Sequence, residues 1–263
     1  MRILLCNDDG FLAEGLRTLA SELTQHGHDV TIVAPSAERS GQSHAMTFFE
    51  PLLVRHVSHQ VYAVHGTPAD SAFIGLRGVL GKTPPDLFIA GINHGLNVGI
   101  DVNYSGTIGA ATEASLLGFR AMAISMDVDP FKGQPGERTQ AFQRTARLAA
   151  ELIGHLHRLD WAPQEMLSLN HPGHEPRGLV AAHCHPDCIY VPHLEHLASR
   201  THSREDLQVY VIGGTTRATP QDGEHDVAAL QAGYATLSFL QTHQGHTPGT
   251  SRLRPFLDML RSA

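Results

Sequence analysis

The chain opens on an apolar run that ends in two adjacent acidic residues. Residues 3–5 are apolar without alternation, which is typical of a strand buried on both faces of a parallel sheet. Asp8 and Asp9 follow directly, and no Lys or Arg comes after them before Arg17. Neighbouring carboxylates at the end of a buried strand repel each other and lose hydration. A bound divalent cation with oxygen ligands would compensate them, and the alternative is a solvated Asp-Gly turn.

The composition indicates one large soluble domain. The chain has 263 residues, of which 41% are hydrophobic and 17% charged. A formal net charge of -7 argues against binding to nucleic acid polymers. No apolar stretch approaches the ~20 residues that a membrane-spanning helix needs, so we expect no membrane partner.

The three cysteines and the start of the chain predict a cytoplasmic protein. An odd number of cysteines is typical of a reducing compartment, and no secretion leader precedes the first strand. Cys184 and Cys188, with His183 and His185 beside them, would make half of a zinc site. No second ligand pair has suitable spacing, so the sequence does not favour zinc.

The order of elements predicts an α/β fold. A strand, a helix over 14–26 and a second strand over 30–33 form a βαβ unit, which builds parallel sheets with right-handed crossovers. Further elements expected are a hairpin within 52–64, helices at 67–79, 108–117, 140–156 and 225–232, loops at 91–99 and 131–136, and strands at 87–90, 121–125, 207–212 and 234–240.

We therefore expect one domain over 1–263 with a Rossmann-like, mostly parallel sheet and helices on both faces. Its core would span about 1–160. From about 161–263 the pattern weakens, because Pro, His and Gly are frequent there. That second part is expected to be an irregular β-rich extension, which returns to the main sheet or reaches a partner subunit.

Three polar segments lie where a doubly wound sheet collects its ligands. A Ser- and Gly-rich loop at 36–47 contains Ser40, and the loop at 91–99 contains Asn93. A Ser-Gly-Thr sequence at 105–107 precedes a helix, and free N–H groups at a helix N-terminus bind anions. Each segment alone also fits a plain loop or helix cap. Together with the two carboxylates, they point to metal-assisted phosphate ester hydrolysis at the carboxyl edge of the sheet.

The same segments match a known family in order and spacing. They are MRILLCNDDG, APSAERSGQS with Thr47, HGTPADS, IAGINHGLNVG and YSGTIGAATEA. On these segments the chain resembles the SurE (survival protein E) family of nucleotidases over roughly its first half. Beyond residue 125 the resemblance thins to short pieces, such as Leu169-Asn170-His171-Pro172.

The resemblance implies one divalent cation per subunit, Mg or Mn, and hydrolysis of nucleoside 5'-monophosphates. It places the metal ligands at Asp8, Asp9, Ser40 and Asn93, and catalytic roles at Asp8, Asp9 and Asn93, with one of the acids orienting the attacking water. Besides Ser40, the positions that match the phosphate pocket are Ser43, Thr47, Asn97, Ser105, Gly106 and Thr107. It also implies a homodimer or homotetramer that exchanges C-terminal segments.

Three departures from the family pattern leave oligomer contacts and substrate preference open. His225 stands where the family usually has Thr before the acid that matches Asp226. Residues 236–240 replace the usual Ser-x-Thr-Pro-Leu run, and His94 lies where a smaller residue is common. The base, the 5' or 3' position, the choice of Mg or Mn, and action on short polyphosphate stay undecided.

Other classes of protein also place acids after a first strand. A haloacid-dehalogenase-type phosphatase would need Asp-x-Asp, whereas Asp8 and Asp9 are adjacent. A receiver-like signalling domain would need a Lys after a late strand, and Lys82 and Lys132 lie in loops unsuited to that role. A nucleotide-binding module without catalysis is the third alternative, which the retained ligand types argue against.

Overall fold

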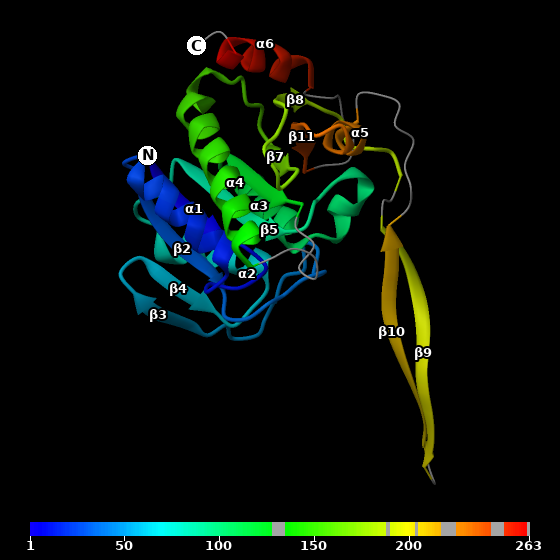
Figure 1. Ribbon diagram of the computed structural model, residues 1–263. Coiled ribbons are helices and arrows are strands. Elements are labelled where there is room, and N and C mark those ends of the chain that lie inside the picture. Colours follow the sequence, from blue (N-terminus) through cyan, green and yellow to red (C-terminus); the bar gives the residue numbers. More distant parts are fainter. Residues whose placement is uncertain (128–134, 188–189, 203–204, 217–224, 243–249, 262–263) are drawn as a thin grey trace.

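A sheet of nine strands forms the centre of the computed structural model, which describes residues 1–127, 135–187, 190–202, 205–216, 225–242 and 250–261 (Figure 1). The strand order is β3-β4-β2-β1-β5-β6-β7-β11-β8. The strands are β1 (Arg2–Cys6), β2 (Asp29–Pro35), β3 (Val54–Ser58), β4 (Val61–Val64), β5 (Leu87–His94), β6 (Ala121–Met126), β7 (Glu165–His171), β8 (Leu179–Ala181) and β11 (Ala235–Gln241).

Helices cover both faces of this sheet. They are α1 (Glu14–Gln25), α2 (Pro68–Phe73), α3 (Gly106–Leu116), α4 (Pro135–His155), α5 (Asp226–Gln231) and α6 (Thr250–Arg261), with shorter helical turns η1 (Ile74–Val79), η2 (Gly99–Tyr104) and η3 (Leu156–Arg158). Leu5 packs into the core under α1 and α4, whereas Leu4 packs into the core under α2 and α3. Neighbouring side chains of β1 thus enter opposite cores, which explains why residues 3–5 are apolar without alternation.

The carboxyl end of β1 lies at the centre of the sheet. β1 pairs in parallel with β2 on one side and with β5 on the other, so the direction of strand order reverses beside it. Ligands of open α/β sheets bind in the crevice at such a reversal. β6 and β7 continue the parallel pairing, while β3 runs antiparallel to β4 and β11 runs antiparallel to β7. The predicted fold class, a mostly parallel sheet with helices on both faces, is confirmed.

The second half of the chain contributes to the main sheet and also leaves it. β7 and β11 pair with each other, and β8 pairs with β11 at the sheet edge. β9 (Tyr190–His202) and β10 (Glu205–Thr216) instead form a separate antiparallel hairpin that projects from the body (Figure 1). The expected strand at 207–212 is therefore the middle of a longer strand.

Several expected boundaries were wrong. β5 continues to His94, so the expected loop at 91–99 begins inside a strand, where the pairing with β6 shifts register between Ala90 and Asn93. The expected helix at 67–79 changes from α to π geometry at Ile74. Residues 131–134 of the expected loop lie outside the described residues, and Pro135 already belongs to α4.

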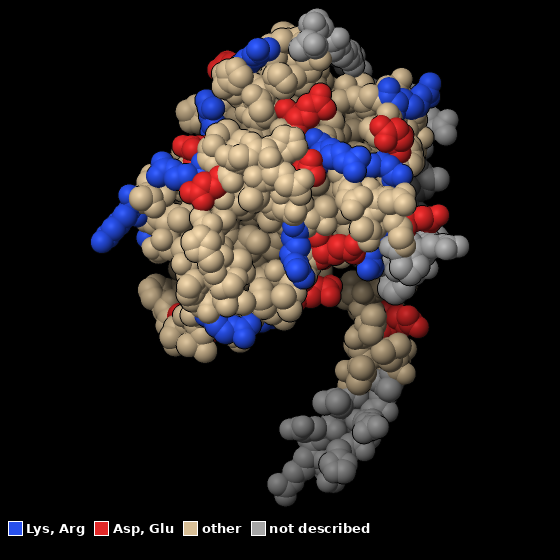
Figure 2. Space-filling view, turned by 60° about the vertical axis from the view of Figure 1, so that its left-hand side comes forward, with Lys and Arg blue, Asp and Glu red and all other residues tan. Residues whose placement is uncertain are grey.

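The surface combines both signs of charge. On the face shown in Figure 2, Lys and Arg side chains are interspersed with Asp and Glu rather than gathered over one element. This distribution provides no extended basic area on that face for a polymeric phosphate backbone. Among the described helices, none has the length and apolar character needed to cross a membrane.

The buried histidine at the end of β7 makes stability depend on pH. Burial lowers the pKa of His171 to about 4 from 6.5. The unfolded chain therefore binds a proton that the folded chain excludes, and stability is lost as pH falls from about 6.5 toward about 4. Between pH 8 and pH 5 we expect the wild type to lose about 2 kcal/mol more than His171→Asn, measured by urea unfolding. Equal losses in the two proteins would contradict this assignment.

Candidate metal and phosphate site

Asp8 and the first turn of α3 are in direct contact. Asp8 is 3% exposed, and the Thr107 hydroxyl donates a hydrogen bond to its Oδ1. A Cβ at Gly106 would lie 3.0 Å from both Cβ and Oδ2 of Asp8, which is closer than such contacts normally allow. Glycine at this position therefore lets the helix N-terminus approach the carboxylate.

The local sequence determines where α3 begins. The Ser105 hydroxyl accepts a hydrogen bond from the Ile108 N–H at 3.1 Å, so this serine acts as the helix cap. The helix starts at Gly106, two residues before the expected start at Ile108. The N–H groups of its first turn and the helix dipole then face the end of β1, which makes this turn suited to an anion.

The two carboxylates have few compensating partners. The pKa of Asp8 is raised to about 6, chiefly by burial; the Thr107 hydrogen bond lowers it, and the neighbouring Asp9 charge raises it. Asp9 Oδ2 is buried and has no hydrogen-bond partner. Asp9 Oδ1 lies 3.4 Å from Nδ1 of His94, and this contact raises the pKa of the histidine. A buried carboxylate oxygen without a partner fits a site for a divalent cation.

Of the other two expected ligands, Ser40 lies on the loop after β2 and Asn93 lies near the end of β5. The Arg39 N–H donates to the Asp8 carbonyl at 2.7 Å, so the backbone next to Ser40 is held at β1. Ser40 itself is exposed, and its hydroxyl donates to Glu38 Oε1 at 3.1 Å. The half-buried Asn93 donates from Nδ2 to the Gly95 carbonyl at 2.9 Å. That hydrogen bond uses the amide N–H, whereas a cation would be bound by the amide oxygen.

Three of the expected phosphate-binding residues make internal contacts. The Ser43 hydroxyl donates to the Asn103 carbonyl at 2.6 Å. Thr47 donates from its N–H and its hydroxyl to the Asp70 carboxylate, at 2.8 and 2.7 Å. Asn97 donates from Nδ2 to the Ser125 hydroxyl at 2.7 Å. In this structure these three side chains hold the surrounding loops.

The partners of these side chains are functional supports that the sequence analysis missed. Asp70 is buried, and it also accepts the Thr67 N–H at 2.9 Å in the capping box that starts α2. The Thr67-x-x-Asp70 spacing was a visible signal for that cap, but not for the contact with Thr47. Asn170 on β7 exchanges two hydrogen bonds of 2.9 Å with the backbone of Asn97. Nothing in the local sequence around Asn170 indicated that contact.

A cavity of about 320 Å³ adjoins the start of α3. Ser43 and Ser105 line it on the side of the helix cap, and Leu240 and Thr242 line it from β11 and the segment that follows. His44 also lines it, with Nε2 2.7 Å from Oε2 of the buried Glu113. The cavity therefore borders the helix cap at Ser105, whereas Asp8, Asp9, Gly106 and Thr107 do not line it.

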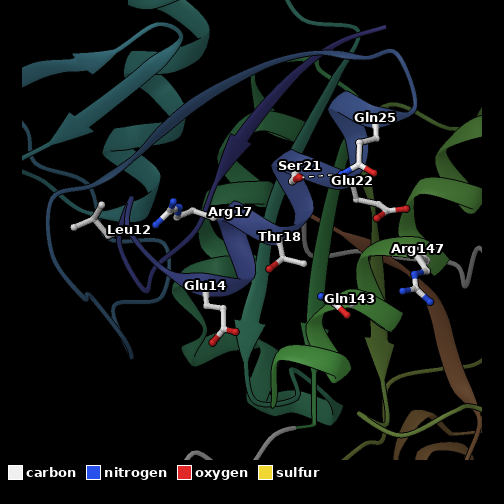
Figure 3. Close-up of a pocket in the computed structure, with 9 residues that line it drawn as sticks. All are labelled: Leu12, Glu14, Arg17, Thr18, Ser21, Glu22, Gln25, Gln143 and Arg147. Atoms are coloured by element: carbon white, nitrogen blue, oxygen red, sulfur yellow. Dashed lines mark hydrogen bonds between the residues drawn. The ribbon is translucent and has the colours of Figure 1, made fainter. Parts of the chain in front are cut away.

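A second, larger space lies away from this edge. A groove of about 600 Å³ runs between α1 and α4, and side chains such as Thr18, Ser21 and Gln143 line it (Figure 3). Its charged residues include Glu22 and Arg147. None of the expected site residues lines this groove, so its size does not make it the candidate site.

The structure does not support the cysteine-based zinc site. Within the described part of the chain, no three His, Cys, Asp or Glu side chains are grouped so that they would hold a metal ion. Cys188 lies outside the described residues. Burial and the nearby Asp226 raise the pKa of the Cys184 thiol, which disfavours the thiolate that zinc binding requires.

Fold and site together define a doubly wound α/β protein with an acidic pair opposite a helix N-terminus. The comparisons with known proteins agree with this class. The family model described as "Survival protein SurE" matches residues 3–212. The chain belongs to the SurE family.

Individual relatives match over almost the whole chain. A protein of Anaeromyxobacter dehalogenans named "5'-nucleotidase SurE" is 36% identical over 264 residues, which cover 97% of this chain and 95% of that protein. A Brucella abortus protein of the same name is 36% identical, covering 90% of this chain and 91% of that protein. The crystal structure of the SurE protein from Aquifex aeolicus superposes with a TM-score of 0.76 at 26% identity, covering 99% of this chain and 100% of that one.

The contact between Gly106 and Asp8 can be tested by a single methyl group. We expect Gly106→Ala to lower the free energy of unfolding by about 1–3 kcal/mol, because the new Cβ would force the helix start away from β1. Gly154→Ala is the matched control, since this glycine also lies in a helix and a Cβ there meets nothing within 4 Å. Urea unfolding measures both, and the idea fails if Gly106→Ala is as stable as the control.

Proposed function

We propose that this chain is a metal-dependent phosphomonoesterase that hydrolyses nucleoside 5'-monophosphates to nucleoside and phosphate. The observation that supports it most directly is the buried pair Asp8 and Asp9, with one carboxylate oxygen unpaired and a helix N-terminus in contact. The relatives named 5'-nucleotidase support the same reaction.

The residues that would hold one Mg or Mn ion are Asp8, Asp9, Ser40 and Asn93. Carboxylate, hydroxyl and amide oxygens are the ligands that such hard cations prefer. When bound, the cation would neutralise negative charge on the phosphate and lower the pKa of the attacking water. To bind the cation, the exposed Ser40 hydroxyl would give up its hydrogen bond to Glu38.

The chain's own groups would bind and orient the phosphate and the water. The N–H groups of Gly106 and Thr107 belong to the first turn of α3 and would hold phosphate oxygens, as helix N-termini do. The Thr107 hydroxyl holds Oδ1 of Asp8 and so sets the orientation of Oδ2. Asp8 or Asp9 would then orient the attacking water and accept its proton. Ser43, Thr47 and Asn97 would contribute by holding the loops around the phosphate.

Phosphate release after chelation tests this proposal. We expect the chelated protein to release no phosphate from nucleoside 5'-monophosphates, and added Mg²⁺ or Mn²⁺ to restore release. Asp8→Asn should lower kcat/KM by several orders of magnitude, because a ligand carboxylate is lost while the side-chain shape is kept. Near-normal activity of Asp8→Asn with Mn²⁺ would contradict the metal assignment.

The same assay settles the substrate class. A panel of 5'-nucleotides, 3'-nucleotides and short polyphosphate, each with Mg²⁺ and with Mn²⁺, compares the alternatives that the sequence leaves open. Thr18 lines the α1–α4 groove, so Thr18→Ala is the control and should leave the rates of phosphate release unchanged. If no substrate gives metal-dependent release, the protein is not a phosphomonoesterase of this kind.

We also propose that the β9–β10 hairpin binds a second copy of the chain, in a homodimer or homotetramer. An isolated two-stranded hairpin is marginally stable in water, and this one exposes many large apolar side chains. Those exposed are Tyr190, Val191, Leu194, Leu197, Val209, Tyr210, Val211 and Ile212. Leu194 and Ile212 face each other across the hairpin and are 65% and 76% exposed.

Charging that cross-strand pair should dissociate the assembly. We expect the double variant Leu194→Asp/Ile212→Asp to move toward the monomer mass in light scattering, because two carboxylates would lose hydration on association. Leu12→Asp is the control, since Leu12 is also exposed (67%) but lies beside α1, outside the hairpin. An unchanged mass for the double variant would rule the hairpin out as the contact.

A further inference from the structure

We propose that His94 is a positioning residue for Asp9: its Nδ1 holds one carboxylate oxygen so that the other faces the cation. This inference rests on the proposed metal-dependent function and adds a residue to it. His94 lies at the end of β5, next to Asn93 and opposite the acidic pair.

The two oxygens of Asp9 have different surroundings. Oδ1 lies 3.4 Å from Nδ1 of His94, with the two side chains 11% and 28% exposed. Oδ2 is buried and has no hydrogen-bond partner. A carboxylate held through one oxygen cannot turn freely, so its second oxygen is presented in one direction. This is the arrangement in which ligating carboxylates are usually held by an outer hydrogen bond.

The histidine ring is itself held in place from two sides. Its centre lies 5.0 Å from the ring of Phe142, a fully buried residue of α4. Its backbone belongs to β5 and pairs with Met126 of β6, and the following Gly95 N–H donates to the Met126 carbonyl at 2.9 Å. The ring is therefore placed between α4 and Asp9 by packing and by the sheet, so it can orient the carboxylate.

A smaller residue at position 94 would leave Asp9 without this contact. Loss of such an outer contact typically weakens metal affinity about 10- to 100-fold. Removal of His94 would change metal affinity in the opposite direction if the histidine acted mainly as a positive charge that competes with the cation. Metal binding would then become tighter. The two cases are separated by measuring metal affinity alone.

The experiment compares amide side chains that place a donor at different points. The Nδ2 of His94→Asn stands near the position of the ring Nδ1, whereas the Nε2 of His94→Gln stands near the ring Nε2. We expect Mn²⁺ alone, titrated into chelated protein and followed by the EPR signal of the free ion, to bind His94→Ala and His94→Gln about 10- to 100-fold more weakly than the wild type. His94→Asn should bind within a few-fold of the wild type. His59→Ala, an exposed histidine in the β3–β4 turn, is the control.

Each outcome decides the inference. The inference is supported if His94→Ala and His94→Gln bind Mn²⁺ weakly while His94→Asn binds it nearly as well as the wild type. Recovery of turnover by His94→Ala at high Mn²⁺ supports it further. Wild-type or tighter affinity of His94→Ala overturns it, as does equal weakening in Asn and Gln, which would indicate packing alone. If His94→Ala does not fold, the comparison of Asn with Gln still decides. Failure of the proposed function looks different, because the wild type itself would then bind no Mn²⁺.

Discussion

The contact between the Asp8 carboxylate and the first turn of α3 is the constraint on which the candidate site depends. It requires β1 to end at the centre of the sheet, where β2 and β5 lie on either side. It also requires a glycine at position 106, because a Cβ there would meet Asp8 at 3.0 Å. The helix N-terminus then provides the favourable electrostatic environment that a buried carboxylate otherwise lacks. The remaining features of the site are arranged around this pair of elements.

The side chains near this contact divide into two groups by what their polar atoms do. Thr47 and Asn97 use theirs on Asp70 and Ser125, so the loops after β2 and β5 are held by buried polar links. Asp9 instead retains a buried oxygen without a partner. Buried polar groups are almost always satisfied, and the proposed cation would satisfy this oxygen.

Sequence reasoning succeeded where the cause was local. The buried β1, the helix expected from residue 67 and the α/β order all follow from spacings within a few residues. The supporting role of Thr47 had no such signal, since its partner Asp70 lies 23 residues further on and either residue alone fits a turn or a cap. β7 was not predicted, because frequent Pro, His and Gly around it obscured a fully buried strand. The helix α6 was missed for a similar reason, as it contains Pro255.

Burial of Asp8 at the end of β1 disfavours the charged form of its carboxyl group. Desolvation raises the pKa of Asp8 to about 6 from 3.8. Without a cation, the folded protein therefore gains stability as pH falls and Asp8 is protonated, whereas it loses stability when His171 is protonated. A cation bound between the two acids would favour the charged form and offset the desolvation. Folding therefore leaves the negative charge at the carboxyl end of β1 poorly compensated, and the proposed cation would compensate it. The same uncompensated charge would favour a cation at the acidic pair, while the N-terminus of α3 would favour the negative phosphate beside it.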